Sequence, residues 1–145
     1  MGTAPLDTAR VTTSAQFTPP NSTATELLDQ AINDFSEAAT LLPASWGASN
    51  VGRATTNAAN GLLGKCLVFR ASATKSKDDY TAAIAAFNKI TGVSLVPDFE
   101  DNFSWQTENN SESIFEFQAS QAFALDNIWL PNDFDNAIGS ISAYS

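Results

Sequence analysis

The feature that most constrains the fold is a repeated pattern in which an Ala is followed four residues later by a Phe. It occurs at Ala31 and Phe35, and again at Ala83 and Phe87. Residues four apart lie on one face of an α-helix, where the small Ala lets a neighbouring helix approach and the Phe fills the adjacent groove. Pro43 follows the first copy and cannot continue a helix. The pattern therefore predicts packed helix pairs.

This arrangement is typical of the second helix in a tetratricopeptide-type hairpin. We therefore predict a mainly α fold, with tetratricopeptide-like helical hairpins of the alpha-alpha superhelix type followed by a short strand-and-loop segment. Residues 1–22 are rich in Thr, Ser and Pro and predict an extended lead-in. Residues 23–92 form the helical region, and residues 93–145 form the strand and loop segment.

Capping residues predict where the helices begin. Thr23 and Glu26 fit a capping box, in which each side chain accepts a hydrogen bond from a backbone N–H at the start of the helix. Thr55 and Ser76 can cap a second and a third helix. Gly92 is expected to close the third helix in a left-handed conformation.

Apolar residues at helical spacing predict the inner faces of the helices. The expected inner residues are Leu28, Ala31, Ile32, Phe35, Ala38, Ala39 and Leu42 in the first helix, Ala58, Ala59, Leu62, Leu63, Cys66 and Phe69 in the second, and Tyr80, Ala83, Ile84, Phe87 and Ile90 in the third. Gly61 and Gly64 each cost about 1 kcal/mol in a helix interior. Such a cost predicts a close contact beside them.

Charge and composition exclude several classes of protein. The 145-residue chain has 7 Lys and Arg against 16 Asp and Glu, a net charge of −9 that would repel the phosphates of nucleic acid. Cys66 is the single cysteine and is expected to be a small buried apolar residue. Residues 1–21 lack the apolar core of a secretory signal or a spanning helix, and the longest apolar stretch, residues 61–69, is short and contains Lys65.

The last third of the sequence changes character and concentrates the aromatic residues. Val93–Val96 and Ile114–Gln118 are predicted as strands or extended segments. Of the 15 aromatic residues, nine follow residue 98, and sugar rings present flat C–H faces that stack on such rings. The candidate ligand-binding residues are Trp105, Trp129, Phe134 and Tyr144. Core packing is the alternative for Trp129, and Phe115 and Phe117 are expected to pack on the helices.

The sequence offers little catalytic or metal chemistry. It contains no His, so Ser-His-Asp and Cys-His arrangements cannot form. If Glu112 and Glu116 share a strand, their Cα atoms lie about 13 Å apart, which is too far for most pairs of glycosidase carboxyl groups. Both residues are expected at a solvated strand edge. Asp133 and Asp135 match a calcium loop poorly because Gly139 falls one position late. We predict no catalytic residue, no metal and no cofactor.

Several local sequences together resemble the middle of the SusD/RagB family over about residues 23–120. They are Leu41-Leu42-Pro43, Gly52-Arg53-Ala54-Thr55, Tyr80-Thr81-Ala82-Ala83-Ile84-Ala85-Ala86-Phe87, Ser94-Leu95-Val96-Pro97 and Glu112-Ser113-Ile114-Phe115-Glu116. Their order and spacing match the family. The resemblance implies a nutrient-binding, chiefly glycan-binding, lipoprotein on the outer-membrane surface of Bacteroidetes. It also implies a SusC-type TonB-dependent transporter as partner and a polysaccharide or oligosaccharide as ligand.

Family members are several times longer, so the resemblance implies that this chain is a fragment without the lipoprotein signal. The helix expected over residues 23–42 then lacks its own hairpin partner, which predicts an exposed apolar stripe along Leu28, Ile32 and Phe35 that favours self-association. The alternative function is a tetratricopeptide-type adaptor that binds a peptide or protein partner. A glycosidase would need a paired acid and nucleophile, and none is visible.

Overall fold

The computed structural model describes residues 3–116 and divides into two compact units. Within the described residues, the first unit comprises 3–47 and 54–91, and the second comprises 48–53 and 92–116. The first unit contains the helices, and the second is built from short turns. The predicted partition at residues 22 and 92 stays a prediction.

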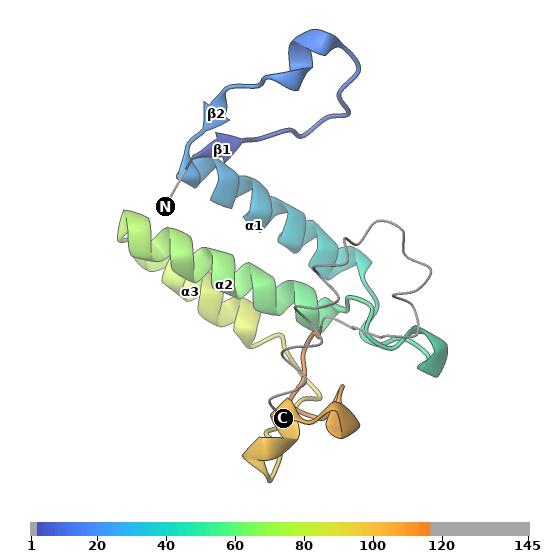
Figure 1. Cartoon of the computed structure of the whole chain (residues 1–145). Coiled ribbons are helices and arrows are strands. Elements are labelled where there is room, and N and C mark those ends of the chain that lie inside the picture. The colour runs from blue at the N-terminus through green and yellow to red at the C-terminus, as the bar shows by residue number, and fades with distance from the viewer. Residues whose placement is uncertain (1–2, 117–145) are drawn as a thin grey trace. The chain divides into compact units, whose positions relative to one another are not determined.

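The first unit is formed by helices α1 (Ala24–Leu41), α2 (Thr56–Thr74) and α3 (Lys77–Phe87). Helix α2 packs against both α1 and α3 (Figure 1). This arrangement confirms the predicted mainly helical fold. None of the helices in the described part of the chain is long and apolar enough to cross a membrane.

The predicted caps are confirmed at the start of all three helices. Thr23 Oγ1 accepts a hydrogen bond from the backbone N–H of Glu26 at 3.2 Å, and the Glu26 carboxylate accepts one from the N–H of Thr23 at 2.7 Å. Thr55 and Ser76 cap α2 and α3, each accepting from the backbone N–H three residues later. The caps were predictable because each depends on residues within one turn.

The predicted end of the third helix is wrong. Helix α3 ends at Phe87, before Gly92. Gly92 does adopt a left-handed φ of 72°, but in the chain beyond the helix. Asn57 on α2 holds that chain, since its Nδ2 donates to the Thr91 carbonyl at 2.7 Å and its Oδ1 accepts from the Thr91 N–H at 3.3 Å.

The core lies where α2 faces its two neighbours. Its buried cluster contains Ile32, Leu63, Leu67, Ala83 and Ala86, with Phe35 and Cys66 packed against it. The expected exposed stripe on the first helix is therefore wrong, because Ile32 is buried and Leu28 and Phe35 are half-buried. Helix α2 supplies the apolar surface that covers this face of α1.

Several residues expected on the inner faces are exposed. Leu62 and Phe69 on α2 and Ile84 on α3 are 38%, 51% and 60% exposed. Asn60 is buried instead, and its Nδ2 donates to the carbonyl of Thr56 at 2.9 Å. Because α2 packs against two helices, its buried arc is centred between them and differs from the stripe that the sequence pattern favoured.

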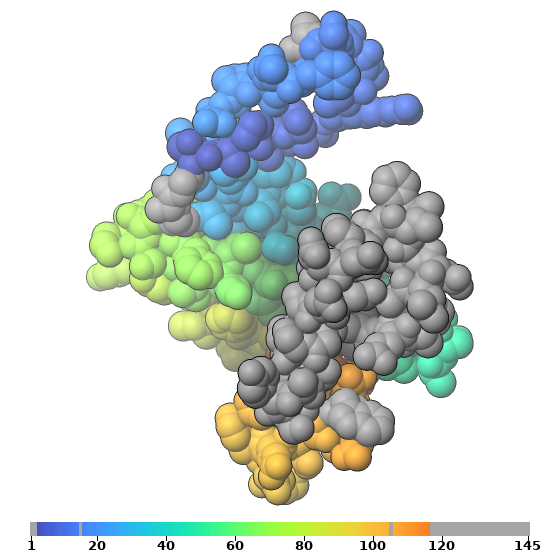
Figure 2. Space-filling model, in the orientation of Figure 1, coloured from blue at the N-terminus to red at the C-terminus, as the bar shows by residue number. Residues whose placement is uncertain are grey.

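The lead-in, predicted as extended, contains two short strands whose pairing closes it into a loop. Strands β1 (Ala4–Pro5) and β2 (Asn21–Ser22) pair antiparallel, with Ala4 opposite Ser22. Between them lies η1 (Ser14–Phe17), a 3-10 helix. The loop (blue in Figure 2) gathers at the end of the unit where α1 begins.

The second unit contains η3 (Phe99–Phe103) and η4 (Trp105–Thr107), two short 3-10 helices. Val93–Val96 forms no strand, and neither do residues 114–116. Ser94 instead pairs with Ser111, since its N–H donates to the Ser111 carbonyl at 2.9 Å and the Ser111 hydroxyl donates to the Ser94 carbonyl at 3.2 Å. A pairing limited to two residues makes no strand ladder.

Candidate functional site

The predicted ligand-binding residues fall mostly beyond the described part of the chain. Trp129, Phe134 and Tyr144 lie outside it, as do Asp133 and Asp135 of the calcium-like sequence. Trp105 is described and begins η4 in the second unit. We therefore build the candidate site from the turns around Trp105.

A network of side-chain hydrogen bonds fixes the backbone of these turns. Asn110 Oδ1 accepts from the N–H groups of Glu112 and Ser113 at 2.9 and 3.2 Å. Asn110 Nδ2 donates to the Asp101 carbonyl at 3.3 Å and to Asn102 Oδ1 at 3.2 Å. Hydrogen bonds from amide side chains thus take the place of the backbone hydrogen bonds between strands that a sheet would provide.

Glu112 and Glu116 serve this network and do not form a solvated strand edge. Glu112 Oε2 accepts from the N–H of Val96 at 3.1 Å and from Asn102 Nδ2 at 3.2 Å. Both carboxylate oxygens of Glu116 accept from the N–H of Asn109 at 3.0 Å. These hydrogen bonds within the unit give both carboxylates a structural role that requires no catalytic function.

Aromatic side chains are exposed on the same unit. Phe99 and Phe103, on η3, are 74% and 69% exposed, and their ring centroids lie 5.2 Å apart with an interplanar angle of 65°. Phe115 is 53% exposed, and its predicted packing on the helices stays a prediction. Phe117 lies outside the described residues. Phe99 and Phe103 lie four residues apart in a polar segment, and this spacing is the sequence signal that could have identified them.

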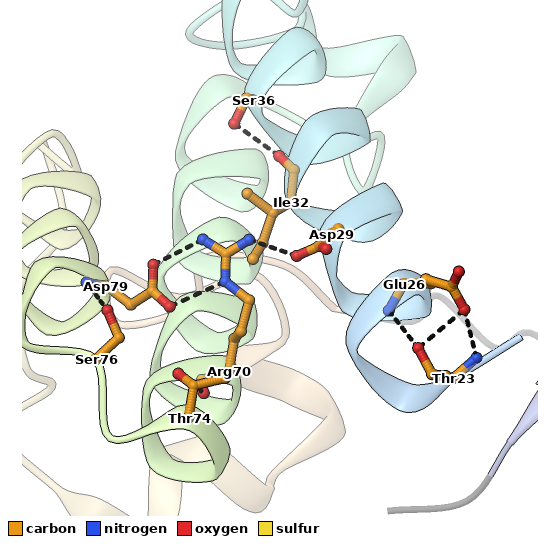
Figure 3. Close-up of polar contacts among 9 residues, drawn as sticks. All are labelled: Thr23, Glu26, Asp29, Ile32, Ser36, Arg70, Thr74, Ser76 and Asp79. Atoms are coloured by element: carbon orange, nitrogen blue, oxygen red, sulfur yellow. Dashed lines mark hydrogen bonds and ion pairs between the residues drawn. The ribbon is translucent and has the colours of Figure 1, made fainter.

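The principal charged cluster of the helical unit surrounds Arg70 (Figure 3). Arg70 Nε and Nη2 donate to the two carboxylate oxygens of Asp79 on α3 at 2.9 and 2.7 Å. Arg70 Nη1 donates to Asp29 on α1 at 2.6 Å. The guanidinium hydrogen bonds hold the pKa of Asp79 below its usual range. This cluster ties three helices together, and both carboxylates are engaged within the fold.

The described residues provide little reactive chemistry. Burial raises the pKa of the Cys66 thiol, which disfavours the reactive thiolate. Among residues 3–116 there is no group of three or more side chains suited to hold a metal ion. The arrangement that remains is a scaffold of helices together with a turn unit that presents aromatic rings.

Comparison with known proteins supports this architecture. The crystal structure of a SusD-like protein from Bacteroides fragilis NCTC 9343 is similar to this chain, with a TM-score of 0.68 and 27% sequence identity over 81% of the chain. This chain spans 23% of the length of that protein. No family model and no curated protein matches the sequence.

The packing of α2 between α1 and α3 defines a helical-hairpin protein of the tetratricopeptide-like class. Within that class, the chain is similar in fold and sequence to a SusD-like protein. The motifs between residues 41 and 116 had indicated the same family, and most of them lie at the helix ends and turns that fix its local structure.

Proposed function

We propose that this chain is part of a non-catalytic nutrient-binding protein, with glycans as the nutrient, in a SusC/SusD-type outer-membrane uptake system. The observation that carries the proposal is the likeness to a SusD-like protein over 81% of the chain. The parent protein is then a surface-exposed lipoprotein of the outer membrane. Its partner is a SusC-type TonB-dependent transporter.

A non-catalytic role agrees with the chemistry of the described residues. Glycosidases use one carboxyl group as acid and a second as base or nucleophile. Glu112 and Glu116 instead accept hydrogen bonds from backbone and amide groups of their own unit. Binding through aromatic rings and amides requires neither a perturbed acid nor a nucleophile.

The proposed glycan contacts are Trp105, Trp129, Phe134 and Tyr144. Indole and phenol rings stack on the C–H faces of sugars, while neighbouring amides pair with hydroxyl groups. Three of these residues follow the turns of the second unit in sequence. They define the variants with which the proposal is tested.

The test is calorimetry of the full-length parent protein against a panel of soluble polysaccharides. We expect one polysaccharide to bind, and Trp129→Ala to weaken that binding at least about fivefold, because one stacked ring contributes about 1–3 kcal/mol. The matched control is Phe17→Ala, which removes a ring that is 73% exposed in the lead-in loop. A parent protein that binds no polysaccharide would overturn the proposal, and Trp129→Ala with unchanged affinity would remove this segment from the site.

The alternative of a peptide adaptor has less support. Such an adaptor needs polar side chains along the concave face that reads the peptide. The row on α2 between its neighbours consists mainly of buried small and apolar residues, including Leu63, Gly64, Leu67 and Ala71. That row is used for packing within the unit.

A further inference from the structure

The exposed ring pair of the second unit requires an explanation that nutrient binding does not provide. Phe99 and Phe103 contact each other at 5.2 Å between centroids, yet each leaves more than two thirds of its surface in water. Exposing two large apolar side chains together forgoes the free energy that burial would contribute. A contiguous apolar surface of this kind commonly marks an interaction site.

Hydrogen bonds hold the backbone segment that carries the pair. Asp98 caps η3 by accepting from the Glu100 N–H at 3.0 Å. The Asp101 carbonyl accepts from the Thr107 hydroxyl and from Asn110 Nδ2. Asn102, between the two rings in sequence, donates to Glu112. The rings are therefore presented on a fixed segment, and binding a partner would cost little ordering of the backbone.

The charge around the pair indicates the chemistry of the partner. Within the described residues, the second unit contains six carboxylates, namely Asp98, Glu100, Asp101, Glu108, Glu112 and Glu116, against one cation, Arg53. Glu112 and Glu116 are engaged with the chain, whereas Glu100 and Glu108 are exposed. Cations are attracted both to carboxylates and to the faces of aromatic rings.

We propose that the Phe99–Phe103 pair and the carboxylates beside it form a docking surface for a basic protein segment that carries Arg or Lys next to apolar side chains. The apolar side chains of that segment cover the rings, and its cations lie over the ring faces and against Glu100. The proposal goes beyond nutrient binding and does not depend on it.

The geometry of the rings favours a protein segment over a sugar. The two ring planes meet at 65°, so one ring presents its face where the other presents its edge. A sugar stacks best on a flat ring face, and a neutral glycan carries no cation to pair with the surrounding carboxylates. A basic amphipathic segment uses both features.

The test is a titration of the isotope-labelled 145-residue chain, followed by NMR, with the synthetic peptide Gly-Arg-Leu-Arg-Phe-Leu-Arg-Gly. We expect saturable binding in 20 mM salt, with shifts centred on residues 98–104. Affinity should fall several-fold in 200 mM salt, since exposed charges are screened over about 10 Å at 0.1 M. A peptide with Glu in place of each Arg should bind at least tenfold more weakly.

Variants separate this surface from general attraction to an acidic chain. The double change Phe99→Ser with Phe103→Ser should weaken peptide binding at least tenfold while leaving the helical signal intact, because both rings are exposed. Phe17→Ser is the matched control and should leave the affinity unchanged. Glu100→Gln tests the charge alone and should weaken binding about two- to fourfold.

Three results would overturn the proposal. The first is absence of saturable peptide binding, and the second is equal affinity of the double variant and the unaltered chain. The third is a neutral hexasaccharide, cellohexaose, that shifts residues 98–104 and displaces the peptide, because the surface would then be a sugar subsite. Failure of the parent protein to bind polysaccharides would leave this proposal standing, so the two proposals fail separately.

Discussion

At the scale of the residue, Arg70 is the side chain on which the helical unit most depends for polar contacts. It lies on α2 and reaches both neighbouring helices, with a bidentate pair to Asp79 and a single bond to Asp29. Its side chain is 24% exposed, against 15% for Asp79 and 49% for Asp29. The pair with Asp79 is the less hydrated of the two and should contribute more to stability.

We predict that Arg70→Met lowers the free energy of unfolding by about 1–2 kcal/mol at pH 7, measured by urea unfolding. This decrease in stability lies between the cost of breaking an exposed ion pair and the cost of removing one partner of a buried ion pair. Arg70→Lys should recover only part of the loss, because an ammonium group cannot bond two carboxylates in the same bidentate geometry. Lys89→Met, which removes an exposed cation, is the control and should change stability little.

The same substitution should have a characteristic pH dependence. The pKa of Asp79 is lowered in the folded state. As the pH falls, the Asp79 carboxylate is therefore protonated in the unfolded chain at a higher pH than in the folded chain. The contribution of the pair is complete above about pH 5 and is lost as the pH falls through the folded pKa. The stability difference between the natural chain and Arg70→Met should therefore narrow below about pH 4. A difference that stays constant down to pH 2 would contradict this account.

At the scale of the element, the sequence predicted helix starts better than helix faces. Thr23, Thr55 and Ser76 cap their helices as expected, since capping is decided within one turn. The exposure of Phe69 on α2 and Ile84 on α3 was not predictable, because it depends on which part of each helix surface the neighbouring helices cover. Periodicity identifies an apolar stripe but not which side of it a neighbour covers.

Gly64 shows how one such contact was partly predictable. The sequence indicated a close approach, and the structure places the Phe87 ring there, with ring atoms 2.5–2.8 Å from where a Cβ would lie. We predict that Gly64→Ala is destabilising in the natural chain, because the added methyl displaces the ring from α2. In a Phe87→Ala background the same change should stabilise by up to about 1 kcal/mol, the helix preference of Ala over Gly.

Thermal unfolding of the four proteins in this double-mutant cycle measures the interaction between the two sites. We expect an interaction energy of about 1–2 kcal/mol. Since Phe87 is 41% exposed, its ring has room to move outward, which keeps the value below that of a fully buried clash. Equal effects of Gly64→Ala in both backgrounds would show that the ring does not restrict residue 64.

At the scale of the whole molecule, the sequence motifs predicted the likeness to a SusD-like protein, but sequence periodicity could not place most residues of the candidate site. Glu112 illustrates why. Its role is set by the N–H of Val96 and the amide of Asn102, which are far from it in sequence. Turns that are held by side-chain hydrogen bonds show no regular spacing of apolar residues in the sequence. Neither their hydrogen bonds nor their exposed rings can therefore be predicted from residue spacing.

The helical unit should nevertheless behave as one cooperative body. Leu67 is 5% exposed and belongs to the cluster to which all three helices contribute. Helix α3 has 11 residues and helices of this length are marginal alone in water, so it depends on α2 for its order. We predict that Leu67→Ala lowers the unfolding free energy by about 2–3 kcal/mol. Hydrogen exchange should then accelerate in α1 and α3 as well as in α2.

Leu62→Ala on the same helix is the matched control, because Leu62 is 38% exposed and lies outside the buried cluster. It should change exchange in α1 and α3 much less, since the removed methyl groups leave no cavity between helices. Acceleration confined to α2 in Leu67→Ala would show that the three helices open separately. Equal acceleration throughout α1, α2 and α3 would instead identify the face of α2 around Leu67 as the contact that makes them one unit.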